Sequence, residues 1–424
     1  MITVVGEVLV DLIEHSPGQP VAYPGGSPAN VAVALARLGR PVNLLTQLGD
    51  DPYGRLLLAH LRDNGVELAP GSRLDSAPTS TARTKLDADG HASYAFDISW
   101  RRLTAGADQG TAAGQPGTAA GRHGTAAAGQ PGTAAGRHGT AAGGQPGTAA
   151  GGQPGTAAGG QPGTAGWQPG TAGGRHGAAG GSDSAAGGQP DSAAATCVHT
   201  GSLAAMLAPG ADDVAAVVRA ARETSMVSFD PNCRPSVIGD PAIARERVAA
   251  LVAVSDIVKV SLDDLAWLYP GRSYRDVGRD WLDQGAGLVV VTLGGDGAWA
   301  LAGHPEAGHP EAGRCEVAVD AYPVEVVDTV GAGDAFTAGL LSALDGADLL
   351  GAARRPALAA IDAATLTDVL LFASRVAAAT CARHGADPPT PADLPTPHPP
   401  GPSPTGPSPP DPSPIKGLGT RFDL

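Results

Sequence analysis

The chain alternates short apolar runs with longer amphipathic stretches, a pattern that predicts strands and helices following each other in turn. Five apolar runs have the length of strands: residues 2–10, 42–47, 226–230, 257–261 and 288–292. Four stretches have the period or composition of helices: residues 53–64, 211–223, 241–254 and the Ala-rich 365–384. Because this repetition places parallel strands in one sheet, it predicts an α/β fold with a doubly wound, mostly parallel sheet flanked by helices.

A second, smaller sheet is predicted from weaker alternation near the N-terminus. Residues 79–98 alternate around a polar turn at 87–90, which indicates a β-hairpin. Together with residues 17–23 this hairpin would form a small β lid, spanning about 12–24 and 79–99. Such a lid over a ligand would exclude water from a reaction.

Two segments have almost no bulky apolar residues and cannot bury a core. The first repeats units such as GTAAGQP and GTAAGRH, and the second is rich in Pro. We expect a disordered insertion without a catalytic role and a disordered tail. The predicted organisation is an N-terminal part with the lid, the insertion, a C-terminal part of the same domain, and the tail, at residues 1–103, 104–195, 196–387 and 388–424.

The composition narrows the classes of function. The net charge is −14, from 28 basic and 42 acidic residues without a Lys/Arg cluster, so nucleic acid is not an expected partner. The N-terminal residues MITVVGEVLVDLI lack a basic region and indicate a strand rather than a signal peptide, and no apolar run reaches membrane-spanning length. The four cysteines lie far apart, which is typical of free thiols in a reduced, cytoplasmic chain.

The sequence VEVVDTVGAGDAFTAGLL at residues 324–341 carries the strongest chemical signal. It predicts an apolar strand through Val324, Val326 and Val327 that ends at Asp328, then a turn of Gly331, Ala332 and Gly333 into a helix. Such a turn leaves backbone N–H groups at the positive end of the helix dipole, which suits a phosphate. Asp334 lies in the first helical turn, where a carboxylate could accept a proton from a hydroxyl group. The alternative is that Asp334 is only an acidic residue favoured by the dipole.

A second glycine-rich turn, GGSPAN at residues 25–30, opens an earlier helix. Ser27 before Pro28 suits the N-cap position, and Asn30 lies in the first turn. We expect Asp11 to follow the end of the strand at 2–10. Asp11 and Asn30 would then lie where open α/β sheets bind ligands; the alternatives are that Asp11 is a turn former and Asn30 an additional helix cap.

Two further loops follow predicted strands. The residues DPNCR at 230–234 form a polar cluster, which is either part of a site or a plain strand-to-helix turn. The residues TLGGDG at 292–297 contain successive glycines, which allow the backbone to approach a phosphate but also suit a hairpin turn.

A chain with both signatures resembles the PfkB (ribokinase-like) family of carbohydrate kinases. The first family signature matches 25–30 and continues through Ala32, Gly39 and Gly49; the second matches 328–334 and continues through Leu341. The resemblance covers nearly everything outside the insertion and the tail.

The resemblance implies roles for individual residues. Asp334 would be the catalytic base, and Gly331, Ala332 and Gly333 would form the anion hole. The sugar would contact Asp11, Gly25, Gly26, Asn30 and Arg234. ATP would contact Ser261, Thr292, Gly294, Gly295, Gly297 and Gly333. A monovalent cation, K⁺ in family terms, would bind Asp328 and the carbonyl of Val330. Mg²⁺ would be held through water by Asp264, which stands where the family usually has the Glu of N-x-x-E and is one methylene shorter.

The expected function is ATP-dependent phosphorylation of a primary hydroxyl on a small sugar. The stretch DPNCRP resembles fructokinases, which favours fructose or a similar ketohexose, while 2-keto-3-deoxygluconate kinases carry a related D-x-N-x-R. Arg234 could bind a sugar-acid carboxylate with two hydrogen bonds, or only order its loop. Ribokinase activity, a non-catalytic sugar-binding protein and an interaction scaffold remain alternatives. The expected partners are the sugar and ATP, with a homodimer formed through the lid.

Overall fold

The computed structural model describes residues 1–14, 20–75, 77–86, 92–101, 195–303 and 313–396. They fall in one compact unit, Met1–Asp108 together with Asp191–Leu424. The predicted insertion, the hairpin turn at 87–90 and most of the predicted tail lie outside the described residues. Residues 388–396, at the start of that tail, are described: Arg375 donates to the carbonyl of Pro395, and Tyr322 donates to the carbonyl of Thr396.

The described residues form a nine-stranded sheet in the order β15-β14-β13-β12-β11-β10-β1-β4-β6. Neighbouring strands from β13 to β6 run parallel, while β14 pairs antiparallel with both β13 and β15. The prediction of a mostly parallel α/β sheet is therefore confirmed. The strands are β1 Ile2–Val5, β4 Val42–Leu45, β6 Glu67–Leu68, β10 Cys197–Gly201, β11 Met226–Asp230, β12 Ile257–Ser261, β13 Leu288–Thr292, β14 Ala298–Ala302 and β15 Cys315–Val319.

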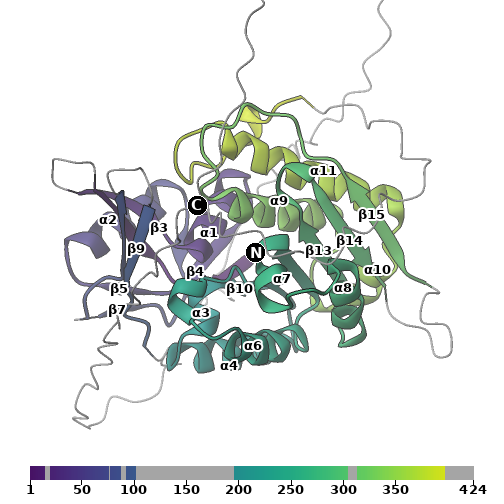
Figure 1. Cartoon of the computed structure of the whole chain (residues 1–424), viewed down its shortest axis with the longest axis horizontal. Coiled ribbons are helices and arrows are strands. Elements are labelled where there is room, and N and C mark those ends of the chain that lie inside the picture. Colours follow the sequence, from purple (N-terminus) through teal and green to yellow (C-terminus); the bar gives the residue numbers. More distant parts are fainter. Residues whose placement is uncertain (15–19, 76, 87–91, 102–194, 304–312, 397–424) are drawn as a thin grey trace, which may run out of the picture. The chain divides into compact units, whose positions relative to one another are not determined.

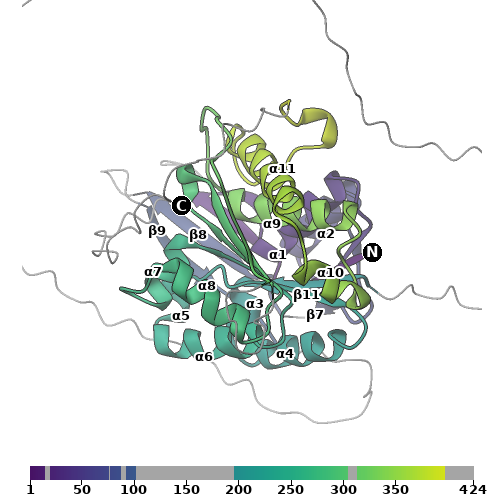
Figure 2. The ribbon, with the colours of Figure 1, turned by 90° about the vertical axis from the view of Figure 1, so that its right-hand side faces the viewer.

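Helices cover both faces of this sheet (Figures 1 and 2). Successive strand residues point to opposite faces, so Leu288 and Val290 pack in one core and Val289 and Val291 in the other. The first core contains α1 Ser27–Arg37, α2 Pro52–Asp63, α9 Ala332–Gly346, α10 Arg355–Ala359 and α11 Ala363–Cys381. The second contains α3 Ser202–Met206, α4 Gly210–Ala221, α6 Pro241–Val252, α7 Leu262–Leu268 and α8 Tyr274–Asp283.

Helix α11 has the length and apolar composition of a membrane span, the one such helix among the described residues. Leu366, Leu370 and Ala373 are buried in the first core, and α11 packs along α9. Its apolar character is therefore explained by its position inside the protein.

A separate four-stranded sheet, in the order β3-β2-β8-β9, confirms the prediction of a second, smaller sheet. Its strands are β2 Leu9–Glu14, β3 Val21–Gly25, β8 Thr81–Leu86 and β9 Ala92–Asp97. A third pair joins β5 Gln47–Gly49 to β7 Arg73–Asp75.

The predicted strand at residues 2–10 is wrong in its extent. It divides into β1, which ends at Val5 in the large sheet, and β2, which begins at Leu9 in the small one. Asp11 consequently lies inside β2, opposite Tyr23, rather than after a strand end. The break occurs because Glu7 is buried and accepts the N–H of Ala204. Gly6 and Glu7 interrupt the apolar run, but nothing local in the sequence indicates the contact of Glu7 with Ala204.

Glu7 makes the stability of this junction depend on pH. Burial raises the pKa of Glu7 from 4.5 to about 7. Since the folded protein then holds this proton more tightly than the unfolded chain, stability should fall as pH rises from 4.5 to about 7. Glu7→Gln retains an acceptor for Ala204 but cannot ionise. We expect it to stabilise the protein at pH 8 by up to about 3 kcal/mol and to change little near pH 4.

Urea unfolding across this pH range measures the effect. The exposed Glu67→Gln on β6 is the control and should leave the pH dependence unchanged. Parallel stability curves for wild type and Glu7→Gln would show that Glu7 does not titrate as described.

Candidate active site

The carboxylate of Asp334 joins the two sequence signatures. Asp334 lies in the first turn of α9 and is 6% exposed. Its Oδ1 accepts a hydrogen bond from Ser27 Oγ at 2.6 Å, and its Oδ2 accepts one from Asn30 Nδ2 at 2.9 Å. A third donor, Asn232 Nδ2, lies 3.3 Å from Oδ1. Ser27 and Asn30 are some 300 positions from Asp334 in the sequence. They reach the same carboxylate because α1 packs against α9.

Burial raises the pKa of Asp334 above its usual range. The hydrogen bonds from Ser27 and Asn30 and the charge of Arg234 oppose this rise, whereas the charge of Asp230 adds to it. A carboxylate with a raised pKa is a stronger proton acceptor than an exposed one. The environment therefore suits Asp334 to general-base chemistry.

The start of α9 presents free backbone donors beside this carboxylate. Gly331 is the N-cap residue, with a left-handed φ of 76°. The N–H of Ala332 is bonded to the carbonyl of Thr329 at 3.2 Å. Among the described residues, no acceptor is bonded to the N–H of Gly333 or Asp334. These two amides, at the positive end of the helix dipole, are available to an anion.

Ser27 and Asn232 are site residues to which the sequence assigned no individual role in the site. Ser27 was expected to be an N-cap, but Gly26 holds that position with a φ of 100°, and the Ser27 hydroxyl is used on Asp334. Asn232 has a φ of 37° and donates to Ser27 Oγ at 2.7 Å. The DPNCR cluster was a visible signal for Asn232, but no local pattern indicates a contact of Ser27 with a residue 307 positions away.

Asp11 lies in the same charged region. Burial raises the pKa of Asp11 to about 6; the charge of Arg234 lowers it and that of Asp334 raises it further. Gly25 in β3 lies beside this carboxylate, and a Cβ there would lie 2.0 Å from Asp11 Oδ2 and displace it. Gly26 is similarly restricted, since a Cβ would lie 2.8 Å from the carbonyl of Glu7.

Arg234 is held by its own loop. Its Nη1 donates to the side-chain oxygen and the carbonyl of Asn232, and to the carbonyl of Cys233 at 3.1 Å. The guanidinium therefore orders the loop that places the Asn232 side chain beside Asp334. Its charge still acts on Asp11 and Asp334, as their pKa shifts show.

The residues expected to contact ATP lie at the ends of adjacent strands. Ser261 ends β12 and Thr292 ends β13, and the two are paired in the parallel ladder. The following turn is a 3₁₀ helix, η1 Gly294–Asp296. A Cβ at Gly294 or Gly295 would meet nothing within 4 Å, whereas one at Gly297 would lie 2.0 Å from the carbonyl of Val319. Gly297 is thus required by the β13–β14 turn, while the other two leave space for a ligand.

The two acidic residues expected at cations are already hydrogen-bonded within the protein. Asp264 accepts from the N–H of Cys233 at 2.8 Å and from Ser261 Oγ at 2.7 Å. Asp328 accepts from the N–H groups of Val330 at 3.0 Å and Gly385 at 2.8 Å. Within the described ranges, no cluster of three or more His, Cys, Asp or Glu side chains could hold a metal ion.

The strand predicted through Val324, Val326 and Val327 is absent. Residues 320–330 have no strand pairing, and the three side chains are 38%, 59% and 47% exposed. The segment follows β15, the edge strand of the large sheet, and is held to α11 by the N–H of Val327 donating to the carbonyl of Cys381. Apolar alternation alone is insufficient to form a strand that has no neighbour.

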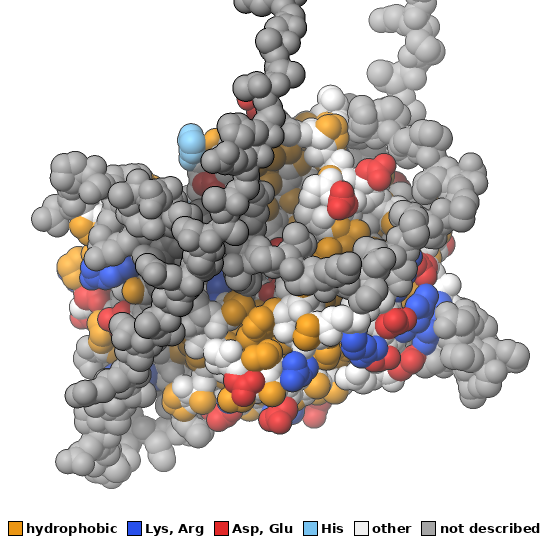
Figure 3. Space-filling view, viewed as in Figure 1, with side chains coloured by type: hydrophobic (Ala, Val, Ile, Leu, Met, Phe, Trp, Pro, Cys, Tyr) orange, Lys and Arg blue, Asp and Glu red, His pale blue; other side chains and the backbone are white. Residues whose placement is uncertain are grey.

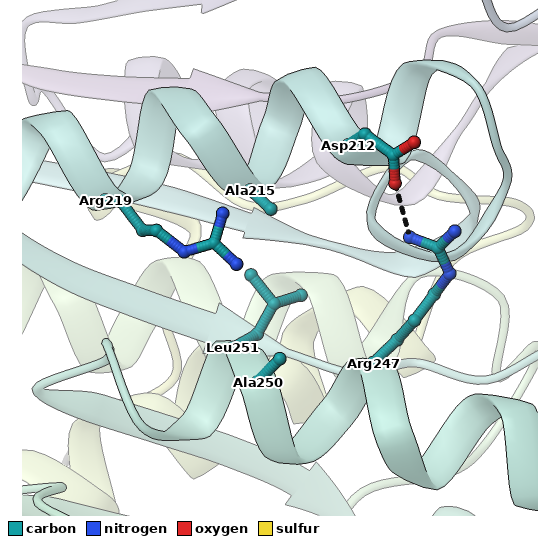
Figure 4. A pocket seen from close by; sticks show the side chains of 6 residues that line it. All are labelled: Asp212, Ala215, Arg219, Arg247, Ala250 and Leu251. Carbon is teal, nitrogen blue, oxygen red and sulfur yellow. Dashed lines mark hydrogen bonds and ion pairs between the residues drawn. The ribbon is translucent and has the colours of Figure 1, made fainter.

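A hollow of about 150 Å³ lies elsewhere, between α4 and α6 (Figure 4). It is lined by Asp212, Ala215, Arg219, Arg247, Ala250 and Leu251, none of them a predicted site residue. Arg247 is neutralised there by Asp212 at 3.2 Å. Basic and acidic side chains are likewise interspersed where they are visible on the face shown in Figure 3, which agrees with the lack of a basic cluster in the sequence.

The chain matches the family model described as pfkB family carbohydrate kinase over residues 1–99 and 186–393. A fructokinase from Rhizobium leguminosarum bv. trifolii is 29% identical over 354 residues, covering 82% of this chain and 81% of the relative. Fructokinase-1 from Oryza sativa subsp. japonica is 27% identical, covering 92% and 94%.

Solved structures show the same fold. A fructokinase with bound ATP from Xylella fastidiosa has a TM-score of 0.62 at 21% identity, covering 91% of this chain and 93% of that one. A fructokinase double mutant from Vibrio cholerae, in fructose-, ADP- and potassium-bound form, has a TM-score of 0.55 at 23% identity, covering 91% and 93%. An aminoimidazole riboside kinase from Salmonella enterica has a TM-score of 0.56 at 22% identity, covering 91% and 94%.

Proposed function

The chain belongs to the pfkB family of carbohydrate kinases and is therefore a phosphotransferase acting on sugar hydroxyls; from this premise we propose that it transfers the γ-phosphoryl group of ATP to a primary hydroxyl of fructose or a similar ketohexose. The observation that carries the proposal is the buried Asp334 carboxylate, held by Ser27 and Asn30 beside the free amides of Gly333 and Asp334.

Asp334 acts on the sugar hydroxyl. Ser27 and Asn30 fix the direction of its carboxylate, and burial makes it a stronger proton acceptor. As Asp334 takes the proton, the hydroxyl oxygen attacks the γ-phosphorus in line. The N–H groups of Gly333 and Asp334 stabilise the charge on the transferring group. Asp11 and Asn30 are the proposed hydrogen-bonding partners of the other sugar hydroxyls.

ATP is the proposed phosphoryl donor, lying along the ends of β12 and β13. Gly294 and Gly295 leave room for its phosphates, and Ser261 and Thr292 line the same strand ends. The Xylella fastidiosa fructokinase of this fold has bound ATP. The proposal extends that ligand to this chain on the basis of the shared fold and the open glycine turn.

Cations complete the proposal. The oxygens of Asp328 and of the Val330 carbonyl are hard donors of the kind that a K⁺ ion accepts, and two backbone amides hold the Asp328 carboxylate in place. Asp264 fits a direct Mg²⁺ ligand poorly, because both of its oxygens accept hydrogen bonds from Cys233 and Ser261. Mg²⁺ is therefore proposed to arrive with ATP, bound mainly by phosphates and water, where it neutralises phosphate charge.

A neutral sugar is favoured over a sugar acid by the position of Arg234. Its Nη1 is committed to Asn232 and Cys233, and its charge already faces Asp11 and Asp334. The end-on fork of Nη1 and Nη2 is therefore not free to bind a sugar carboxylate with two hydrogen bonds. The relatives named as fructokinases support the same choice.

A coupled ADP-release assay across ketoses, aldoses, nucleosides and sugar acids tests the substrate. We expect a ketohexose to have the highest kcat/KM. Arg234→Met should then lower kcat/KM by similar, modest factors for all sugars, because it loosens the Asn232 loop. Arg219 on α4 is exposed, and Arg219→Met is the control: it should leave kcat/KM unchanged for every sugar. If sugar acids are the best substrates and Arg234→Met raises only their KM, the sugar-acid kinase replaces this proposal.

A second copy of the chain is the proposed partner of the small sheet. Strand β3 is an edge strand, and its Val21 and Tyr23 are 43% and 45% exposed. Such an edge is suited to pairing or packing with another chain.

A further inference from the structure

A buried ion pair lies beneath the start of α9. Lys259, in the centre of β12, has a side chain that is 4% exposed, and its Nζ is 3.0 Å from Asp230 Oδ2 at the end of β11. Lys is among the residues that are almost never fully buried unless they are paired. Replacing such a pair by apolar residues is often neutral or stabilising, so stability alone is a poor reason for it.

The pair is in contact with the phosphoryl side of the site. A Cβ built at Gly333 would lie 3.2 Å from Lys259 Nζ, which places the ammonium directly against this residue. Thr337 Oγ1 forms the second link, since it lies 3.3 Å from Asp230 Oδ2 and donates to the carbonyl of Gly333 at 3.0 Å. Asp230 Oδ1 is buried without a hydrogen-bond partner in the described structure. Asp230 is thus held mainly by Lys259 and Thr337.

The ammonium of Lys259 and the free amides at the start of α9 both lie at Gly333. The free N–H groups of Gly333 and Asp334 face the incoming phosphoryl group, while the ammonium of Lys259 lies against Gly333 from within the protein. A positive charge in a buried site acts more strongly than one in water. The Asp230 carboxylate offsets part of this charge, but the ammonium is the end of the pair that lies against Gly333, so the pair adds to the potential of the helix N-terminus, where negative charge increases during transfer.

We propose that Lys259, held by Asp230 and Thr337, is a positioning residue of the phosphoryl site: its ammonium fixes the backbone at Gly333 and strengthens the electrostatic field of the amides there. This inference rests on the proposed function of those amides. A Cβ at position 333 would crowd the ammonium at 3.2 Å, so glycine at 333 gives the ammonium its present position without strain.

The test separates charge from stability with Lys259→Met, Asp230→Asn and the double variant, all in the full chain. Each single variant leaves an unpaired buried group and should lower Tm. In the double variant Tm should recover, while kcat stays about ten- to a hundredfold below wild type, less than the loss of a direct donor. The KM for ATP and for the sugar should change less than threefold. A double variant with both Tm and kcat restored would overturn the proposal and show a structural pair.

Thr337→Val provides a second arm that does not depend on recovery of the double variant. It is nearly isosteric and removes the hydroxyl that lies between Asp230 and the Gly333 carbonyl, and we expect a severalfold loss of kcat with KM unchanged. An unchanged kcat in this variant would also overturn the proposal. Asp334→Asn is assayed alongside: if it is inactive while the double variant is fully active, only the role of Lys259 is rejected, whereas an active Asp334→Asn rejects the proposed function itself.

Discussion

Asp334→Asn is expected to lower kcat by about 10²–10⁴-fold, the usual contribution of a positioned general base. Asn retains the size of Asp334 and can still accept from Ser27 through its side-chain oxygen, so the fold should be preserved. It cannot take a proton from the sugar hydroxyl. ATP affinity should change less than threefold, because the amides of Gly333 and Asn at 334 remain in place.

The control addresses the alternative that Asp334 is only an acidic residue favoured by the helix dipole, without a catalytic role. Asp276 also lies in the first turn of a helix, α8, which packs in the opposite core. Asp276→Asn removes the same favourable charge–dipole interaction without touching the site, and its kcat should equal that of wild type. Steady-state kinetics and equilibrium ATP binding compare the two variants. Near-wild-type turnover in Asp334→Asn would exclude it as the base.

Gly331→Ala is expected to lower kcat by about 10²-fold, comparable with the removal of one oxyanion-hole donor. Gly331 has a φ of 76°, and a Cβ there would lie 2.7 Å from the Cβ of Ala386 and 2.9 Å from its Cα. Relief of this contact requires the turn to move away from the 385–386 backbone. The amides at 333 and 334 and the Asp334 carboxylate would move with it.

Gly65→Ala is the matched control for this substitution. Gly65 has a φ of 75°, nearly that of Gly331, but a Cβ there would meet nothing within 4 Å. It should therefore cost only about 1 kcal/mol of stability from the left-handed backbone, with kcat unchanged. Turnover and thermal unfolding are measured for both variants. Equal effects on kcat would mean that backbone strain, and not the position of the anion hole, accounts for the loss.

The strands and helices were largely predictable because their signals are local. The strands 226–230, 257–261 and 288–292 have the predicted limits, since each is apolar, buried on both faces and bounded by polar turns. The errors concern strands whose fate depends on distant neighbours, and they include the predicted strand 42–47, which divides into β4 in the large sheet and β5, which pairs with β7. Residues 2–10 divide where Glu7 meets Ala204, and Val324–Val327 find no strand to pair with.

The site was predictable only as far as its residues carry a motif. Asp334 and Asn30 were indicated separately by two signatures, and the structure joins them with one hydrogen bond. Ser27 suits a helix N-cap so well that its local role hides its tertiary one. Lys259 interrupts the apolar sequence IVKVS, yet the partner that makes its burial possible, Asp230, lies on the neighbouring strand. Such pairs become visible only when the sheet is assembled.

The most direct measurement follows the γ-phosphoryl group itself. The full chain is incubated with γ-labelled ATP, Mg²⁺ and K⁺, with and without fructose, and the labelled products are separated. The account predicts that label passes to a sugar phosphate in equal amounts with ADP, that little inorganic phosphate forms, and that Asp334→Asn loses this transfer. Label released only as inorganic phosphate, at a rate independent of every sugar tested, would contradict phosphoryl transfer to a sugar hydroxyl.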